Sequence, residues 1–225
     1  MGRSISRRPQ AGMVFGATFD HGDARDHSSI GATITSIGTP TTALHLALNG
    51  SADQVHAPDN DAYSFGDGSS DSPFSVFAWV RMADATRFRL VQKWGGTTAL
   101  REWGFGTDGA NDLRLFLQDD SAGRIDKWTA TALTAQEGSW ISVAATYSGS
   151  GTVAGMDLYV DGVAVSTVNS TTGSYTAMEN DSARLDIGSL TPDSTFANGD
   201  IDSLQIFDRK LAATGVAILH QQGRR

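Results

Sequence analysis

Apolar side chains recur at every second position in several stretches of this chain, and that period constrains its fold more than any other feature. Residues 113–118 alternate leucine with polar or aromatic residues, while 74–81 and 141–147 carry apolar groups at both sets of positions. A period of two is typical of β-strands, because successive side chains point to opposite faces of a sheet. Strands that are apolar on both faces are expected in the centre of a layered β-structure.

Turns and further strands complete an almost entirely β pattern. Asp161 and Gly162 separate two apolar runs and predict a two-residue hairpin, because Asp-Gly tolerates positive φ. About a dozen strands are too many for one open sheet of ordinary size, so two packed sheets are predicted. A single helix is expected at 211–222. The further strands are expected at 13–19, 43–48, 54–57, 87–94, 102–106, 124–130, 183–188 and 200–207.

Composition narrows the function classes. The formal net charge of -8 argues against general nucleic-acid binding, which requires basic surfaces. Without cysteine the chain cannot form disulfides, thiolate metal sites or a cysteine nucleophile. No stretch approaches the roughly 18 consecutive apolar residues of a membrane span, and the first residues do not read as a signal peptide.

The chain is predicted to have two parts. Residues 1–12 are basic, polar and without periodicity, and we expect a flexible arm there. Residues 13–225 are expected to form a single domain. Arg3, Arg7 and Arg8 make the arm a candidate for docking on an acidic partner surface, and the alternative is a solvated tail.

The order of several motifs resembles one family. Residues 74–80 read Phe-Ser-Val-Phe-Ala-Trp-Val, and 138–147 read Gly-Ser-Trp-Ile-Ser-Val-Ala-Ala-Thr-Tyr. Residues 158–162 read Leu-Tyr-Val-Asp-Gly, and 196–211 contain Gly-Asp-Ile-Asp and end in Asp-Arg-Lys-Leu. Together they resemble the laminin-G-like, concanavalin A-like lectin family. The resemblance spans roughly 13–222 and implies a two-sheet antiparallel jelly-roll sandwich with a short C-terminal helix, a fold that leaves function open.

The resemblance also implies a metal. Family members often hold a structural calcium between an early Asp and the closing Ile-Asp segment, and the matching positions here are Asp53 and Asp202, with Asn49 nearby. Calcium prefers hard oxygen ligands of this kind. The alternative is that these side chains only cap turns.

Two groups of residues are candidates for ligand binding. Asp59, Asn60 and Asp61 form a polar cluster suited to a sugar hydroxyl or an ion, although such clusters are more often solvated turns. Trp94 and Trp128 lie at the ends of predicted strands and are candidates for stacking on a sugar ring, with burial as the alternative. The other three tryptophans lie within strand patterns and are expected in the core: Trp79, Trp103 and Trp140.

No catalytic constellation stands out. Glu102, Glu137 and Glu179 are isolated, so the paired carboxylates of related glucanases have no counterpart on one strand. No serine stands in a Gly-x-Ser-x-Gly turn. We therefore expect a binding or structural module and not an enzyme.

Two functions remain open. The first is a structural protein of a tailed-phage virion, in head decoration or the tail, made in the host cytoplasm. The lack of cysteine and of an export signal, with only a basic arm beside the domain, favours it. The second is an extracellular carbohydrate-binding or adhesion lectin, with or without calcium. The expected partners are other virion proteins or surface glycans, with no membrane and no nucleic acid, and a homo-oligomer suits either function.

Overall fold

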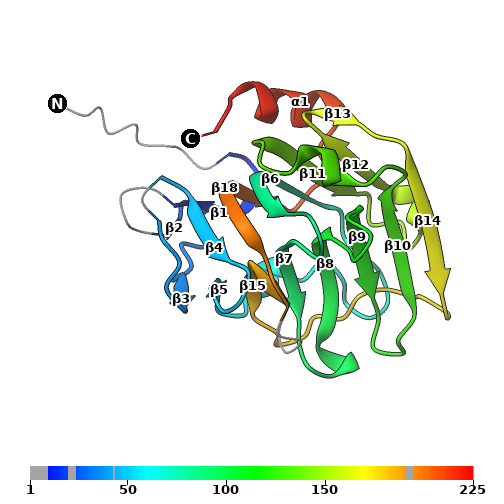
Figure 1. Ribbon diagram of the computed structural model, residues 1–225. Helices are drawn as coiled ribbons and strands as arrows, with labels where there is room; N and C mark the ends of the chain where they lie inside the picture. Colours follow the sequence, from blue (N-terminus) through cyan, green and yellow to red (C-terminus); the bar gives the residue numbers. More distant parts are fainter. Residues whose placement is uncertain (1–9, 20–23, 43, 191–194, 225) are drawn as a thin grey trace.

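The structure, a computed structural model, describes residues 10–19, 24–42, 44–190 and 195–224. Two eight-stranded antiparallel sheets stack face to face, and one α-helix lies outside them (Figure 1). The predicted fold class, an all-β two-sheet sandwich, is confirmed. Arg3, Arg7 and Arg8 of the predicted arm lie outside the described residues.

Sheet A contains the strands that were expected to be apolar on both faces. Its strands are β1 (Met13–Thr18), β2 (Arg25–Asp26), β4 (Leu46–Asn49), β6 (Phe74–Asp84), β11 (Ile141–Tyr147), β12 (Met156–Val160), β13 (Val163–Ala164) and β18 (Asn198–Phe207). The order across the sheet is β13-β12-β11-β6-β18-β1-β2, and β4 also pairs with β18. Asp161 and Gly162 have φ of 50° and 76° between β12 and β13, which confirms the predicted hairpin.

Sheet B contains the remaining long strands. Its strands are β3 (Thr35–Ile37), β5 (Gln54–Ala57), β7 (Arg89–Trp94), β8 (Arg101–Thr107), β9 (Leu113–Gln118), β10 (Arg124–Thr129), β14 (Thr167–Thr172) and β15 (Leu185–Ile187). The order across the sheet is β14-β10-β9-β8-β7-β15-β5-β3. The sequence did not predict β14, whose Thr-rich and polar residues show no alternation of burial.

Short elements connect the two sheets. A two-stranded ribbon joins β16 (Ser189–Leu190) and β17 (Thr195–Phe196). Four 3-10 turns interrupt the connections, at Asp61–Tyr63, Thr98–Leu100, Leu133–Gln136 and Val153–Gly155. The helix α1 (Ala213–Gln221) lies inside the range expected from the sequence. None of the helices in the described ranges is long and apolar enough to cross a membrane.

The inner faces of the two sheets meet in one apolar core. Phe74 and Val76 of sheet A and Trp103 and Leu115 of sheet B are fully buried there. Because side chains alternate along each strand, the residues between these positions point to the outer faces. The outer faces therefore decide what each sheet presents to its surroundings.

The helix α1 covers part of the outer face of sheet A. Val216 and Leu219 of α1 pack with Phe77, Tyr159 and Phe207, which project outward from β6, β12 and β18. Figure 1 shows α1 beside the end of the sandwich that carries β11, β12 and β13. On sheet B, the described residues place no α-helix over the outer face.

Asp71 fixes the segment that leads from β14 to β15. Its carboxylate accepts hydrogen bonds from the hydroxyls of Tyr147 and Tyr175, at 2.6 and 2.8 Å. It also accepts one from the N–H of Met178, at 2.9 Å. Burial raises the pKa of Asp71, and these three bonds oppose that shift. Since β14 and β15 are separated by four other strands of sheet B, this carboxylate sets the course of a long connection.

Replacing Asp71 by Ala is expected to lower the free energy of unfolding by about 2–4 kcal/mol, because two tyrosine hydroxyls and one N–H lose their acceptor. Urea unfolding followed by tryptophan fluorescence measures this loss. Asp157→Ala is the control, because the Asp157 side chain is 46% exposed and its ion pair with Lys210 lies at the surface. This substitution should lower the free energy of unfolding by less than about 1 kcal/mol. Equal losses in the two variants would contradict the role given to Asp71.

Candidate functional site

The outer face of sheet B carries aromatic rings that are covered by arginine side chains. These residues alternate with core residues such as Leu115, Leu117 and Ile125, so they point away from the other sheet. We call this set the arginine face. It consists of Trp94 of β7, Arg101 of β8, Arg114 and Phe116 of β9, and Arg124, Asp126 and Trp128 of β10.

The rings of Trp94 and Phe116 form the base of the arginine face. They meet edge to face, with centroids 5.0 Å apart and planes at 89°, and Leu190 packs against them. Gly104 of β8 pairs with Phe116, and a Cβ at Gly104 would come within 2.3 Å of that ring. Because Gly104 has no side chain, the Phe116 ring can lie across β8 toward Trp94.

Guanidinium groups lie above these rings. The Cζ atom of Arg101 is 5.0 Å from the Trp94 centroid, and that of Arg124 is 4.6 Å from the Phe116 centroid. Arg114 lies between Phe116 and Trp128, 5.9 and 5.7 Å from their centroids. Trp94 and Phe116 are only 7% and 6% exposed. The arginine face therefore presents guanidinium groups held over rings, at distances typical of cation–π contacts.

Asp126 neutralises part of the positive charge. Its Oδ1 accepts hydrogen bonds from Arg114 and Arg124 at 2.7 to 2.9 Å. Burial lowers the pKa of Arg124 and the Asp126 carboxylate opposes that shift, while the positive charges of Arg114 and Arg101 lower the pKa further. Three guanidinium groups thus repel one another around one shared carboxylate.

A β-bulge at the start of β8 determines which of its side chains point outward and which point inward. Lys93 pairs with Trp103 and Trp94 pairs with Arg101, so the ladder skips Glu102. An extra residue of this kind changes the direction in which side chains point. Arg101 consequently joins Trp94 on the outer face, while Glu102 turns to Lys93 in the interior.

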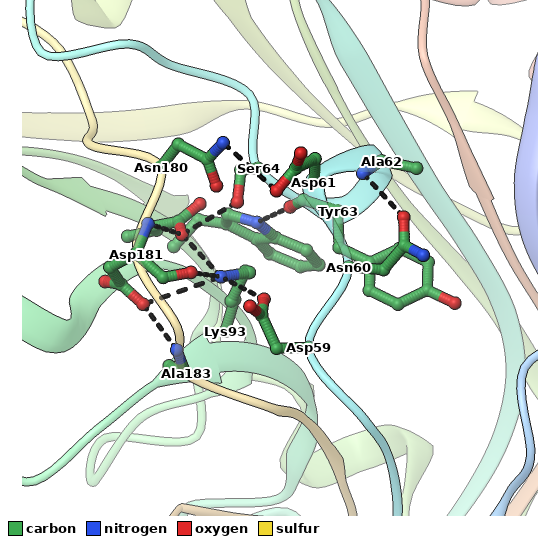
Figure 2. Close-up of polar contacts among 12 residues, drawn as sticks. Asp59, Asn60, Asp61, Ala62, Tyr63, Ser64, Lys93, Asn180, Asp181 and Ala183 are labelled. Carbon is green, nitrogen blue, oxygen red and sulfur yellow. Dashed lines mark hydrogen bonds and ion pairs between the residues drawn. The ribbon is translucent and has the colours of Figure 1, made fainter.

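A second polar cluster is buried around Lys93 (Figure 2). The Lys93 Nζ lies 2.7 Å from Glu102 Oε1 and 3.0 Å from Asp59 Oδ1. It lies 3.5 Å from Asp181 Oδ1 and also donates to the Asp181 carbonyl. Glu102 Oε1 accepts two further bonds, from Ser64 Oγ and from the Asp181 N–H. The cluster joins β7 and β8 to the segments that precede β6 and β15.

The cluster contains more carboxyl groups than ammonium groups. Burial raises the pKa of Glu102 to about 7, although the Lys93 ammonium opposes the shift. Burial alone would lower the pKa of Lys93, but the surrounding carboxylates outweigh it and the pKa lies above its ordinary value. Because one ammonium faces three carboxylates, a proton on Glu102 removes an unfavourable negative charge from the interior.

The predicted ligand cluster 59–61 serves the chain's own contacts. Asp59 pairs with Lys93, and Asn60 Oδ1 caps a 3-10 turn by accepting from the Ala62 N–H at 2.9 Å. Asp61 Oδ1 accepts from Asn180 Nδ2 at 3.2 Å (Figure 2). Ligand binding by these three residues stays a prediction.

The residues predicted to hold calcium are not all brought together. Asn49 Oδ1 accepts from three backbone N–H groups that follow it, including that of Asp53, and Asp53 Oδ1 accepts from the Thr39 N–H. Asn49 pairs with Asn198, and Asp202 lies four residues further along β18, roughly 13 Å away. Asn49 and Asp53 thus lie together and Asp202 lies apart, and calcium binding at these positions stays a prediction. Within the described ranges no three His, Asp or Glu side chains are placed to hold a metal ion.

The predicted tryptophans separate into three environments. Trp94 and Trp128 lie on the outer face of sheet B, Trp94 buried beneath Arg101 and Trp128 half-buried, and ligand binding by them stays a prediction; Trp103 fills the core as expected. Trp79 instead packs beneath α1, and Trp140 lies at the surface with Arg224 4.1 Å from its ring. The core prediction was therefore wrong for these last two.

Sequence reasoning missed the other members of the arginine face. Phe116, Arg114 and Arg124 were visible only as the outward positions of the alternating runs 113–118 and 124–130, and Arg101 lies outside both runs. That alternation was the available signal, and pairing of the two runs side by side would have placed Arg114, Phe116, Arg124 and Asp126 together.

A cavity lies at the edge of the sandwich, where β10 of sheet B approaches β12 of sheet A. Its volume is about 260 Å³, and its walls include Leu133, Val160 and Val165. No charged side chain lines it. Thr129, Thr131, Gln136 and Ser166 supply its polar groups, whereas the arginine face concentrates charged donors and aromatic rings, so we take that face as the candidate site.

The family to which the chain belongs follows from a match over most of its length. A family model described as the concanavalin A-like lectin/glucanases superfamily matches residues 49–217. The chain belongs to this superfamily. The resemblance inferred from the motifs is thereby confirmed. A search of curated proteins finds no match to this chain.

Solved structures share the fold of this superfamily member. The receptor binding domain of botulinum neurotoxin C/D mosaic serotype matches with a TM-score of 0.71 and 14% identity, over 94% of this chain and 51% of that one. The binding domain of botulinum neurotoxin serotype G matches with a TM-score of 0.71 and 18% identity, over 93% of this chain and 51% of that one. The binding domain of Paraclostridial Mosquitocidal Protein 1 matches with a TM-score of 0.68 and 14% identity, over 94% of this chain and 52% of that one. The chain spans about half of each of these structures, and at such identities they show the fold alone.

The substitution Glu102→Gln is expected to flatten the pH dependence of stability of this superfamily member. The folded-state pKa of Glu102, about 7, exceeds its ordinary value of 4.5, so the folded protein holds an extra proton between these values. The stabilisation that this proton gives the folded protein is complete below the unfolded-state pKa of Glu102. It is lost as the pH rises through the folded-state pKa, and the loss in free energy of unfolding is at most about 3 kcal/mol.

Urea unfolding of the wild type and the variant, between about pH 5 and about pH 8, measures this difference. The wild type should lose more stability than the variant as the pH rises. Parallel curves for the two proteins would show that Glu102 does not titrate in this window.

Proposed function

We propose that this domain binds carbohydrate and that the arginine face of sheet B receives the ligand. The observation that carries the proposal is an outer sheet face where Trp94, Phe116 and Trp128 lie under guanidinium groups. Sugars present many hydroxyls and apolar ring faces. The guanidinium groups offer planar hydrogen-bond donors for the hydroxyls, and the half-buried ring of Trp128 offers apolar surface, while Trp94 and Phe116 hold the arginines from beneath. The described residues place no helix over this face, in contrast to sheet A.

The comparisons support a binding role. The superfamily description names lectins and glucanases, and the titles of the similar structures describe a receptor binding domain and a binding domain of botulinum neurotoxins. The carbohydrate itself, and its place on the arginine face, are proposals for this chain.

We also propose that the domain does not hydrolyse its ligand. A glycosidase needs a carboxyl held protonated at the ligand and a second carboxylate opposite it. Glu102 has a suitable pKa, about 7, but its side chain is fully buried beside Lys93. On the arginine face, Asp126 is bound by two arginines. Neither carboxyl is placed to attack or protonate a sugar.

The biological setting stays a prediction. A virion protein of a tailed phage and an extracellular lectin are both compatible with a glycan-binding face, because a virion surface protein may present such a face to its host. The docking role of Arg3, Arg7 and Arg8, the homo-oligomer and structural calcium likewise stay predictions.

Titration of the nitrogen-15-labelled protein with an array of oligosaccharides, followed by NMR, tests the proposed function. The indole N–H signals of Trp94 and Trp128 should shift on binding, whereas that of Trp103, which donates to the Tyr63 carbonyl in the core, should not. Trp128→Ala should weaken binding by roughly 3- to 10-fold, because it removes ring surface from the face.

Trp140→Ala is the matched control, because Trp140 also lies under arginines but beside sheet A. It should leave the affinity unchanged. If no oligosaccharide shifts the Trp94 or Trp128 signal, the proposed function fails.

A further inference from the structure

The arginine face concentrates positive charge on a protein whose formal net charge is -8. Arg114 and Arg124 share one carboxylate, that of Asp126, and Asp108 approaches Arg114 only to 4.0 Å, while Arg101 lies over Trp94 without a carboxylate of its own among the described residues. Like charges at short range repel, and they are brought together stably when an anion binds among them. The local excess of charge is opposite in sign to that of the whole chain.

Unused hydrogen-bond donors point to the same conclusion. A guanidinium carries five N–H donors, and Arg114 and Arg124 each direct only Nε and one Nη to Asp126. For Arg101, the described residues supply no hydrogen bond or ion pair to its guanidinium, whose Nε is buried. Because this Nε is buried, the donors that Arg101 can offer to a ligand are those of its Nη atoms.

We propose that the carbohydrate bound by the arginine face is anionic, and that Arg101, together with Arg114 and Arg124, binds its carboxylate or sulfate groups. This inference rests on the proposed function and names the ligand class of the same site. Guanidinium groups bind oxyanions through paired, charge-assisted hydrogen bonds, which are stronger than those to neutral hydroxyls. The rings of Trp94 and Phe116 hold two of these groups in place, so little side-chain freedom is lost on binding.

Isothermal titration with matched oligosaccharides tests the ligand class and separates its two sources. Hexagalacturonate carries carboxylates, and its methyl ester is the neutral counterpart. Sulfated maltohexaose carries sulfates, and maltohexaose is its neutral counterpart. At least one anionic probe should bind at least about ten-fold more tightly than its neutral counterpart, and the affinity should fall as salt is raised.

Two substitutions with opposite expected effects locate the binding. Arg101→Gln should weaken anion binding by about ten-fold or more, because it removes a charged donor at the face. Asp126→Asn keeps an acceptor for both arginines but removes a negative charge, so it should tighten anion binding by roughly two- to five-fold at low salt. A purely structural role of Asp126 gives no such gain.

Arg209→Gln is the control for charge, since Arg209 lies over Phe207 on the side of sheet A and its loss changes the net charge equally. It should alter the affinity by less than about two-fold. Melting curves establish that each variant is folded.

The outcomes separate the two proposals. If a neutral probe binds as tightly as its anionic counterpart and shifts the Trp94 and Trp128 indole signals, the anionic ligand is rejected while the proposed function stands. Anion binding that Arg101→Gln leaves unchanged likewise rejects the inference. If none of the four probes binds, the inference is rejected, and carbohydrate binding is decided by the indole signals in the titration with the oligosaccharide array.

Discussion

The buried ammonium group of Lys93 is the contact around which this end of the sandwich is organised. An isolated ammonium would cost several kcal/mol in such an interior, so carboxylates must converge on it. Glu102, Asp59 and Asp181 do so from β8 and from the connections before β6 and before β15. Glu102 reaches Lys93 because a bulge at the start of β8 turns it inward, and the same bulge leaves Arg101 on the outer face. The buried cluster and the arginine face are thus two consequences of one irregularity in sheet B.

The two sheets cover their outer faces in different ways. Sheet A buries Phe77 and Phe207 beneath Val216 and Leu219 of α1, which excludes water and leaves little to interact with. Sheet B has no helix above it in the described part of the chain, and its outward rings lie beneath arginines instead. Guanidinium groups shield the rings with one surface while their edges keep hydrogen-bond donors available. The proposed ligand is therefore assigned to sheet B.

The sequence predicted the fold far better than the site. Period-two runs and the Asp161-Gly162 turn identified most long strands, because both signals depend on local geometry alone. The site depends on which strands lie side by side. Trp94 and Trp128 were selected singly, but nothing local placed Phe116 between them or turned Glu102 inward. Asp202 lies apart from Asn49 for the same reason, since a motif match carries no distance between its residues.

The arginine face has more guanidinium groups than carboxylates. This excess explains how the face can be ordered and still attract an anion. Without an oxygen acceptor at position 126, Arg114 and Arg124 would lose the contact that holds them together over the rings. The positive charges of Arg101, Arg114 and Arg124 exceed the single negative charge of Asp126, so the face keeps an excess of positive charge. One carboxylate therefore orders two guanidinium groups without neutralising the face. Because charges on the rest of this acidic surface are screened over about 8 Å at physiological ionic strength, an approaching anion responds mainly to this local excess.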